Sequence, residues 1–129
     1  MAPLCLDQGV GIIPWSPLAR GRLARPPEAG KTTRSETDGF GKRLYAAMED
    51  ADARVQQALE GIVKARKLPH AQVALAWLLQ KRGVASPIIG ATKMQHLEDA
   101  VTALEVKLSA EEARALEAAY VPHPVAGFA

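Results

Sequence analysis

The sequence predicts an α/β fold in which two short buried strands are separated and followed by helices. Residues 10–13 and 84–90 are brief apolar runs, as expected for strands covered on both faces of a parallel sheet. Between them lie two longer segments, 52–67 and 70–82, whose length and apolar spacing indicate helices. Each strand leads into a loop that contains glycine. Because strands separated by helices form a βαβ unit, we expect the two strands to be parallel with a right-handed crossover.

The amino-terminal residues are predicted to be the last turns of a helix, which ends near Gly9. The first strand then runs to Pro14, which has no backbone N–H to donate to a neighbouring strand. Since this helix has little chain before it, we expect the sequence to begin inside a larger fold.

The loop after this strand, residues 14–23, is the first candidate for a binding site. Loops at the carboxyl ends of parallel strands bind ligands in many α/β proteins. Arg20 and Arg22, together with backbone N–H groups, suit a phosphate-bearing ligand. The alternative is a simple turn in which Trp15 fills the core and the arginines are solvated.

A long polar connection is predicted over residues 24–50. It is either a lid that closes over a ligand or a solvated segment. Two helices follow: an amphipathic one over 52–67, and one over 70–82 that is apolar nearly all round and ends at Gly83.

After the second strand, Thr92 is predicted to cap a helix whose apolar stripe contains Met94, Leu97, Val101 and Leu104. Ser109 and Glu112 form the pattern of a capping box, so a last helix should run from there to Tyr120.

Composition narrows the class of protein. The formal charge of +2 is too small to indicate a nucleic-acid-binding protein. No apolar run approaches the length of a membrane span, and no signal peptide is evident. The single cysteine, Cys5, excludes an internal disulfide, so we expect a cytoplasmic protein.

Three motifs resemble the aldo-keto reductase family in the family's own order. Residues 14–23 (PWSPLARGRL) resemble the segment after the seventh barrel strand, 71–79 (AQVALAWLL) the next helix, and 87–92 (PIIGAT) the eighth strand and its loop. The tail at 123–128 is similar to the end of some bacterial members. The resemblance implies the C-terminal fragment of a (β/α)8 TIM barrel, a single partial domain over residues 1–129 with the order strand, loop, helix, helix, strand, helix, helix. A complete barrel needs about 250 residues.

The resemblance also implies that both loops bind NADP(H). The first loop would supply Trp15, Ser16, Pro17, Leu18 and Gly21, with Trp15 stacked on the nicotinamide. The second loop would bind the 2′-phosphate of NADPH at a helix amino terminus. Its residues would be Gly90, Ala91, Thr92, Lys93 and His96. His96, Asp99 and Ala100 depart from the family pattern, which weakens the expected adenine contacts. The alternatives are a simple helix cap for Thr92, a solvated charge for Lys93, and an exposed helix surface for His96 and Asp99.

Catalytic residues are not predicted. The resembling reductases use an Asp, a Tyr, a Lys and a His from the first half of the barrel, and those motifs do not occur here. Tyr45 and Tyr120 lie in other contexts, and the histidines lack the spacing of metal ligands. In the parent fold NADPH would reduce an aldehyde or ketone, whereas this chain alone should be inactive. The alternative is a non-catalytic nucleotide-binding module, or one that self-associates through uncovered barrel surface.

Overall fold

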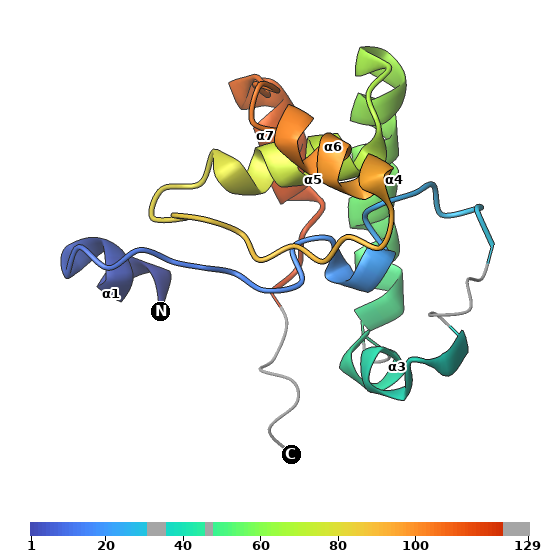
Figure 1. Cartoon of the computed structure of the whole chain (residues 1–129), viewed down its shortest axis with the longest axis horizontal. Helices are drawn as coiled ribbons and strands as arrows, with labels where there is room; N and C mark the ends of the chain where they lie inside the picture. The colour runs from blue at the N-terminus through green and yellow to red at the C-terminus, as the bar shows by residue number, and fades with distance from the viewer. Residues whose placement is uncertain (31–35, 46–47, 123–129) are drawn as a thin grey trace.

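The computed structural model describes residues 1–30, 36–45 and 48–122 (Figure 1). A short helix begins the chain, two extended segments cross the molecule, and helices gather on one side of them. The elements in chain order are α1 (Ala2–Asp7), the 3-10 turn η1 (Ala19–Gly21), α3 (Gly39–Tyr45), α4 (Glu49–Arg66), α5 (His70–Leu79), α6 (Met94–Thr102) and α7 (Ala110–Ala118).

The two predicted strands lie side by side and are parallel. Ile12 bridges Val84, and Trp15 bridges Ile88. The Ile12 N–H donates to the Gly83 carbonyl at 2.7 Å, and the Ala85 N–H donates to the Ile12 carbonyl at 2.9 Å. The parallel neighbourhood therefore agrees with the expected βαβ arrangement.

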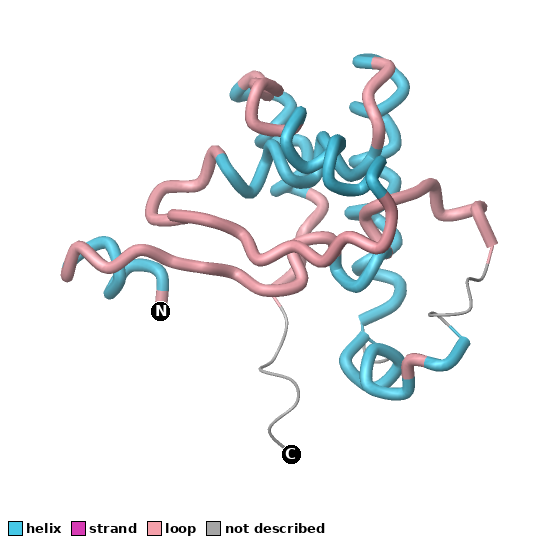
Figure 2. The backbone as a smooth tube through the Cα atoms, viewed as in Figure 1, coloured by secondary structure: helices cyan, strands magenta, loops and turns pink. Residues whose placement is uncertain are grey.

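Regular strands are not found among the described residues, however, so that part of the prediction is not confirmed. Figure 2 draws both segments as loops, and their pairing consists of the two isolated bridges. Pro14 and Pro87 lack N–H donors, and each segment is bridged only to the other within the described ranges. Two strands without further neighbours give a marginal sheet.

The core lies between helices α4, α5 and α7. Its buried side chains are Leu59 and Ile62 of α4, three residues of α5, Leu108, and Leu116 of α7. Val73 of α5 is fully buried, with 0% of its surface exposed. These buried positions agree with the amphipathic spacing of the 52–67 segment and with the all-round apolar character predicted for the 70–82 segment.

Of the two helix caps predicted from the sequence, one is confirmed and the other is wrong. The capping box is confirmed: Ser109 Oγ accepts from the Glu112 N–H, and the Glu112 carboxylate accepts from the Ser109 N–H at 2.7 Å. The Thr92 cap is wrong, because Lys93 takes the N-cap position of α6 with an extended backbone and no side-chain cap bond. Thr92 therefore stands one residue outside the position from which it could cap.

The connection predicted over 24–50 contains a helix, α3, in its described part. The tail motif at 123–128 lies outside the described residues. Among the described helices, none combines the length and apolar character that crossing a membrane requires.

Candidate functional site

The first candidate loop is held against the core by its two leucines. Leu18 and Leu23 pack against the core cluster. Between them the backbone is left-handed at Ala19, Arg20 and Gly21, with φ of 47°, 57° and 96°. Left-handed backbone is uncommon for residues other than glycine and is concentrated at functional sites.

The loop closes on itself through turn hydrogen bonds. The Gly21 N–H donates to the Leu18 carbonyl at 2.9 Å, and the Leu23 N–H donates to the same carbonyl at 3.2 Å. Ala19 donates to Ser16 at 2.9 Å. These three N–H groups are therefore engaged within the loop, and the side chains of Arg20 and Arg22 offer it charged donors toward an anion.

Trp15 does not fill the core. Its side chain is 59% exposed, and its backbone bridges Ile88 at the start of the second candidate loop. The interpretation of Trp15 as a core residue is therefore wrong. An exposed indole beside both loops can stack on a flat ring.

An ion pair connects this loop to Asp38, the residue before α3. Arg20 Nε donates to Asp38, and Asp38 also accepts from the Gly41 N–H at 2.8 Å. The Arg20 guanidinium lies 5.5 Å from the centre of the Phe40 ring. The hydrogen bond with Asp38 raises the pKa of Arg20, so this side chain stays cationic.

Arg22 connects the same loop to α4. Its guanidinium lies 3.5 Å from Asp52 and 3.8 Å from Glu49, and it covers the Tyr45 ring at 4.4 Å. Burial raises the pKa of Tyr45, and the neighbouring Arg22 charge opposes that effect. Tyr45 is therefore a neutral ring that supports the arginine.

A small hollow of ≈ 70 Å³ lies between this loop and α3. We call it the basic pocket; its lining consists of Ala19, Arg20, Arg22, Arg25, Asp38, Gly41, Lys42 and Tyr45. Four of these side chains are cationic and one is a carboxylate, and Arg22 also pairs with Glu49 and Asp52; four positive charges thus meet three negative ones, which leaves the pocket a small positive balance that favours an anion. Its lining is a chemical match for a phosphate, because arginine and lysine are the usual donors to phosphate oxygens.

The second candidate loop is open to solvent. Gly90, Ala91, Thr92, Lys93 and His96 are all exposed. They surround the start of α6, where no side chain caps the first N–H groups. An uncapped helix amino terminus attracts negative charge through these N–H groups and the helix dipole.

Two side chains of α6 that depart from the family pattern have structural partners. Asp99 accepts from Gln72 of α5 at 2.9 Å. Ala100 is partly buried and lines an apolar hollow beside α5. Asp99 is thus committed to helix packing rather than to an exposed helix surface.

Sequence reasoning missed the contribution of α3 to the basic pocket. Asp38 and Tyr45 lie far from Arg20 and Arg22 in the sequence, so no local spacing connects them. The sequence did contain one indication that residues 24–50 contribute to a site, namely the length of this connection. A lid over a ligand was one of its two interpretations. Among the described residues, no group of His, Cys, Asp or Glu side chains could hold a metal ion.

The close fit of α3 against Arg20 gives a testable prediction. A Cβ added at Gly41 would lie 2.5 Å from Asp38 Oδ2 and 3.1 Å from Arg20 Nε. Gly41→Ala should therefore lower the free energy of unfolding by about 1–3 kcal/mol through steric strain. Gly39→Ala is the matched control, since nothing lies within 4 Å of its added Cβ. Urea denaturation of both variants measures the difference, and equal midpoints would contradict the described contact.

Comparison with known proteins places the chain among enzymes of one family. The family model for the aldo/keto reductase family matches residues 1–121. An aldo-keto reductase of Fusarium vanettenii is 39% identical over 127 residues, which are 98% of this chain and 34% of that protein. The versiconal hemiacetal acetate reductase of Aspergillus parasiticus is 39% identical over 126 residues, which are 97% of this chain and 36% of that reductase. The norsolorinic acid reductase B of the same species is 35% identical over 118 residues, which are 92% of this chain and 30% of that reductase.

The chain thus spans about a third of the length of these relatives. The family fold is a (β/α)8 barrel and its usual cofactor is NAD(P)H. The matched region contains both candidate loops, α3 and the basic pocket. This chain belongs to the aldo-keto reductase family.

Proposed function

We propose that this chain is the C-terminal part of an NADPH-dependent aldo-keto reductase and supplies its cofactor-binding loops. The observation that carries the proposal is the parallel pairing of residues 12–15 with 84–88, because it starts both loops at the same end of the paired segments. The same proposal includes the order of elements expected at the end of a barrel, which is strand, loop, helices, strand, helices.

Each part of the cofactor has candidate partners in this chain. Trp15 offers an exposed ring for the nicotinamide. The loop of Ser16, Pro17, Leu18 and Gly21, with the basic pocket beside it, suits the pyrophosphate. The amino terminus of α6, with Gly90, Ala91, Thr92, Lys93 and His96, suits the adenosine 2′-phosphate, which favours NADPH over NADH.

The parent reaction is hydride transfer between NADPH and an aldehyde or ketone, with the hydride supplied by the bound cofactor. This chain positions the cofactor but provides no proton donor. Tyr45 is unsuitable for that role, because its ring is covered by Arg22 and burial raises its pKa. We therefore infer that the chain alone is inactive. The single cysteine is in keeping with a cytoplasmic enzyme.

A titration of the purified chain with NADPH and with NADH tests this proposal. We expect quenching of tryptophan fluorescence on binding, and at least about 10-fold tighter binding of NADPH, because one charge-assisted hydrogen bond to its extra phosphate contributes about 1.5–3 kcal/mol. Mixing the chain with NADPH and reactive aldehydes should give no oxidation of the cofactor. Equal affinity for the two nucleotides, or measurable turnover, would contradict the proposal.

A second candidate function is that of a non-catalytic module that oligomerises. It is favoured by the large apolar side chains that remain exposed on α6 and on the paired segments. This candidate does not require nucleotide binding, so the titration above separates it from the first.

A further inference from the structure

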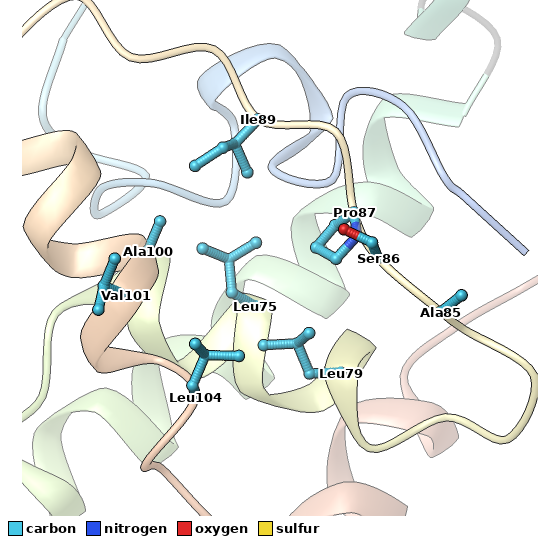
Figure 3. A pocket seen from close by; sticks show the side chains of 9 residues that line it. All are labelled: Leu75, Leu79, Ala85, Ser86, Pro87, Ile89, Ala100, Val101 and Leu104. Atoms are coloured by element: carbon cyan, nitrogen blue, oxygen red, sulfur yellow. The ribbon is translucent and has the colours of Figure 1, made fainter.

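The apolar hollow beside α5 and the basic pocket differ in what they contain. The hollow is lined by apolar side chains such as Leu75, Ile89 and Val101 (Figure 3). Since the chain spans about a third of its relatives, the remainder of the barrel is expected to cover that hollow. The basic pocket is different, because an anion of the chain itself, the carboxylate of Asp38, belongs to its lining.

Asp38 binds Arg20 with one carboxylate oxygen and caps α3 with the other. Its Oδ2 accepts from Arg20 Nε, and its Oδ1 accepts from the Gly41 N–H at 2.8 Å. The Asp38 carbonyl also accepts from the Lys42 N–H at 3.1 Å, the bond that an N-cap residue makes. The position of Asp38 on α3 therefore has support that does not involve Arg20.

The Arg20–Asp38 pair is partly shielded from water. The two side chains are 21% and 13% exposed, and the Phe40 ring lies 5.5 Å from the guanidinium. A pair shielded in this way attracts more strongly than one on an open surface. Much of the charge that Arg20 could offer to a phosphate is therefore compensated within the chain.

The backbone of the first loop carries Arg20 to this pair. Ala19 and Arg20 are both left-handed, with φ of 47° and 57°. Two successive non-glycine residues keep such a backbone only where the surrounding structure determines it. Arg20 is thus a positioned side chain of the loop, and its contact with Asp38 is part of the arrangement of the pocket.

A phosphate group in the basic pocket would have the same sign of charge as Asp38 and would need the same donor. Like charges that share one small pocket repel each other. Arg22 is also paired with carboxylates, and Lys42 Nζ donates to the Glu36 carbonyl at 2.6 Å. Arg20 can therefore serve a phosphate fully only by giving up its bond to Asp38.

We propose that Asp38 competes with a phosphate group of the ligand for Arg20, so that this carboxylate restrains the affinity of the basic pocket. Binding of a pyrophosphate transfers Arg20 from Asp38 to a phosphate oxygen, while Asp38 keeps its bond to the Gly41 N–H. The inference rests on the proposed function for the identity of the ligand. It adds that the residue before α3 regulates how tightly that ligand binds.

Calorimetric titration of the full chain with inorganic pyrophosphate tests this inference. Asp38→Asn removes the charge and keeps an oxygen that can cap α3. It should bind pyrophosphate at least about 3-fold more tightly than wild type, the effect of one unit charge about 6 Å away even at the dielectric constant of water. Asp38→Ser, which also caps helices well, should act in the same direction. Circular dichroism checks that the variants are folded.

Glu111→Gln is the matched control. It removes the same charge from an exposed residue in the first turn of α7, which does not line the basic pocket. Its affinity for pyrophosphate should equal that of wild type. An equal gain in Glu111→Gln and Asp38→Asn would overturn the inference, because net charge alone would then explain both.

A double-mutant cycle tests whether the competition is for Arg20. In an Arg20→Gln chain, the further change Asp38→Asn should give a smaller gain in affinity than it gives in wild type. The remaining cations of the pocket keep binding measurable. An equal gain in both backgrounds would overturn the inference, since Asp38 would then act by general repulsion.

Three other results would also overturn it: weaker binding by Asp38→Asn, unchanged binding by Asp38→Asn, or no pyrophosphate binding by any variant. Weaker binding would show that Asp38 positions Arg20 for the phosphate instead of competing with it. Titration of Asp38→Asn with NADPH separates this inference from the proposed function. Tighter binding of pyrophosphate without binding of NADPH would contradict the proposed function alone, whereas equal NADPH affinity of wild type and Asp38→Asn would contradict the competition alone.

Discussion

Leu59→Ala is expected to lower the free energy of unfolding by about 3 kcal/mol, which reduces the ratio of folded to unfolded chain about 100-fold. Leu59 is 3% exposed and lies in the cluster that joins α4, α5 and α7. Removing three carbon atoms from this site loses their burial and leaves a cavity that the three packed helices can only partly fill. Urea denaturation of wild type and variant measures the change.

The matched control for this variant is Leu4→Ala. It removes the same atoms from α1, where Leu4 is 60% exposed, so its effect should stay within about 0.5 kcal/mol. Equal losses at the two leucines would show that the helical cluster around Leu59 is not the stabilising core of this chain.

Arg22→Ala is expected to weaken NADPH binding about 10- to 100-fold. Arg22 lines the basic pocket and is held there by Asp52, Glu49 and the Tyr45 ring. Its loss removes one charge-assisted contact to a phosphate, which contributes about 1.5–3 kcal/mol, whereas the hydrogen bond from Gln56 of α4 to the backbone carbonyl of residue 22 does not depend on the side chain. Fluorescence titration at two salt concentrations measures both the affinity and its dependence on ionic strength.

Arg66→Ala provides the comparison for Arg22→Ala. Arg66 lies at the end of α4, where it pairs with Glu112 at 3.6 Å and donates to the Lys107 carbonyl at 2.9 Å, and it does not line the basic pocket. Its replacement should leave NADPH affinity within about twofold of wild type, because it removes no side chain from the lining of the pocket. If the two arginine variants bind NADPH equally well, the basic pocket is not a cofactor site.

Helices α4, α5, α6 and α7 were predictable from the sequence because their signals are local, whereas α3 was not predicted. The spacing around Leu59 and Ile62, and the pair Ser109 and Glu112, each lie within a few turns of one helix. The capping box needs only four consecutive residues, and its geometry was confirmed. Lys93 shows the limit of such reasoning, since it displaced Thr92 from the N-cap position by a single residue.

The contacts that build the candidate site were less predictable because they join distant parts of the chain. Asp38 reaches Arg20 across 18 residues, and Gln72 reaches Asp99 across 27. The second contact joins α5 to one side of α6, whereas the apolar stripe predicted for this helix is exposed. Strand formation depends in the same way on neighbouring strands. Among the described residues, each of the two paired segments is bridged only to the other.

Binding of NADPH by this chain requires, as its central claim, that the turns after Ile13 and Ile89 hold one dinucleotide together. Titration of the ¹⁵N-labelled chain with NADPH, followed by amide chemical shifts, tests this claim most directly. We predict that the amides of residues 15–23 and 90–96 shift in parallel and give one common dissociation constant. Shifts confined to a single loop, or two loops that saturate at different NADPH concentrations, would contradict the claim.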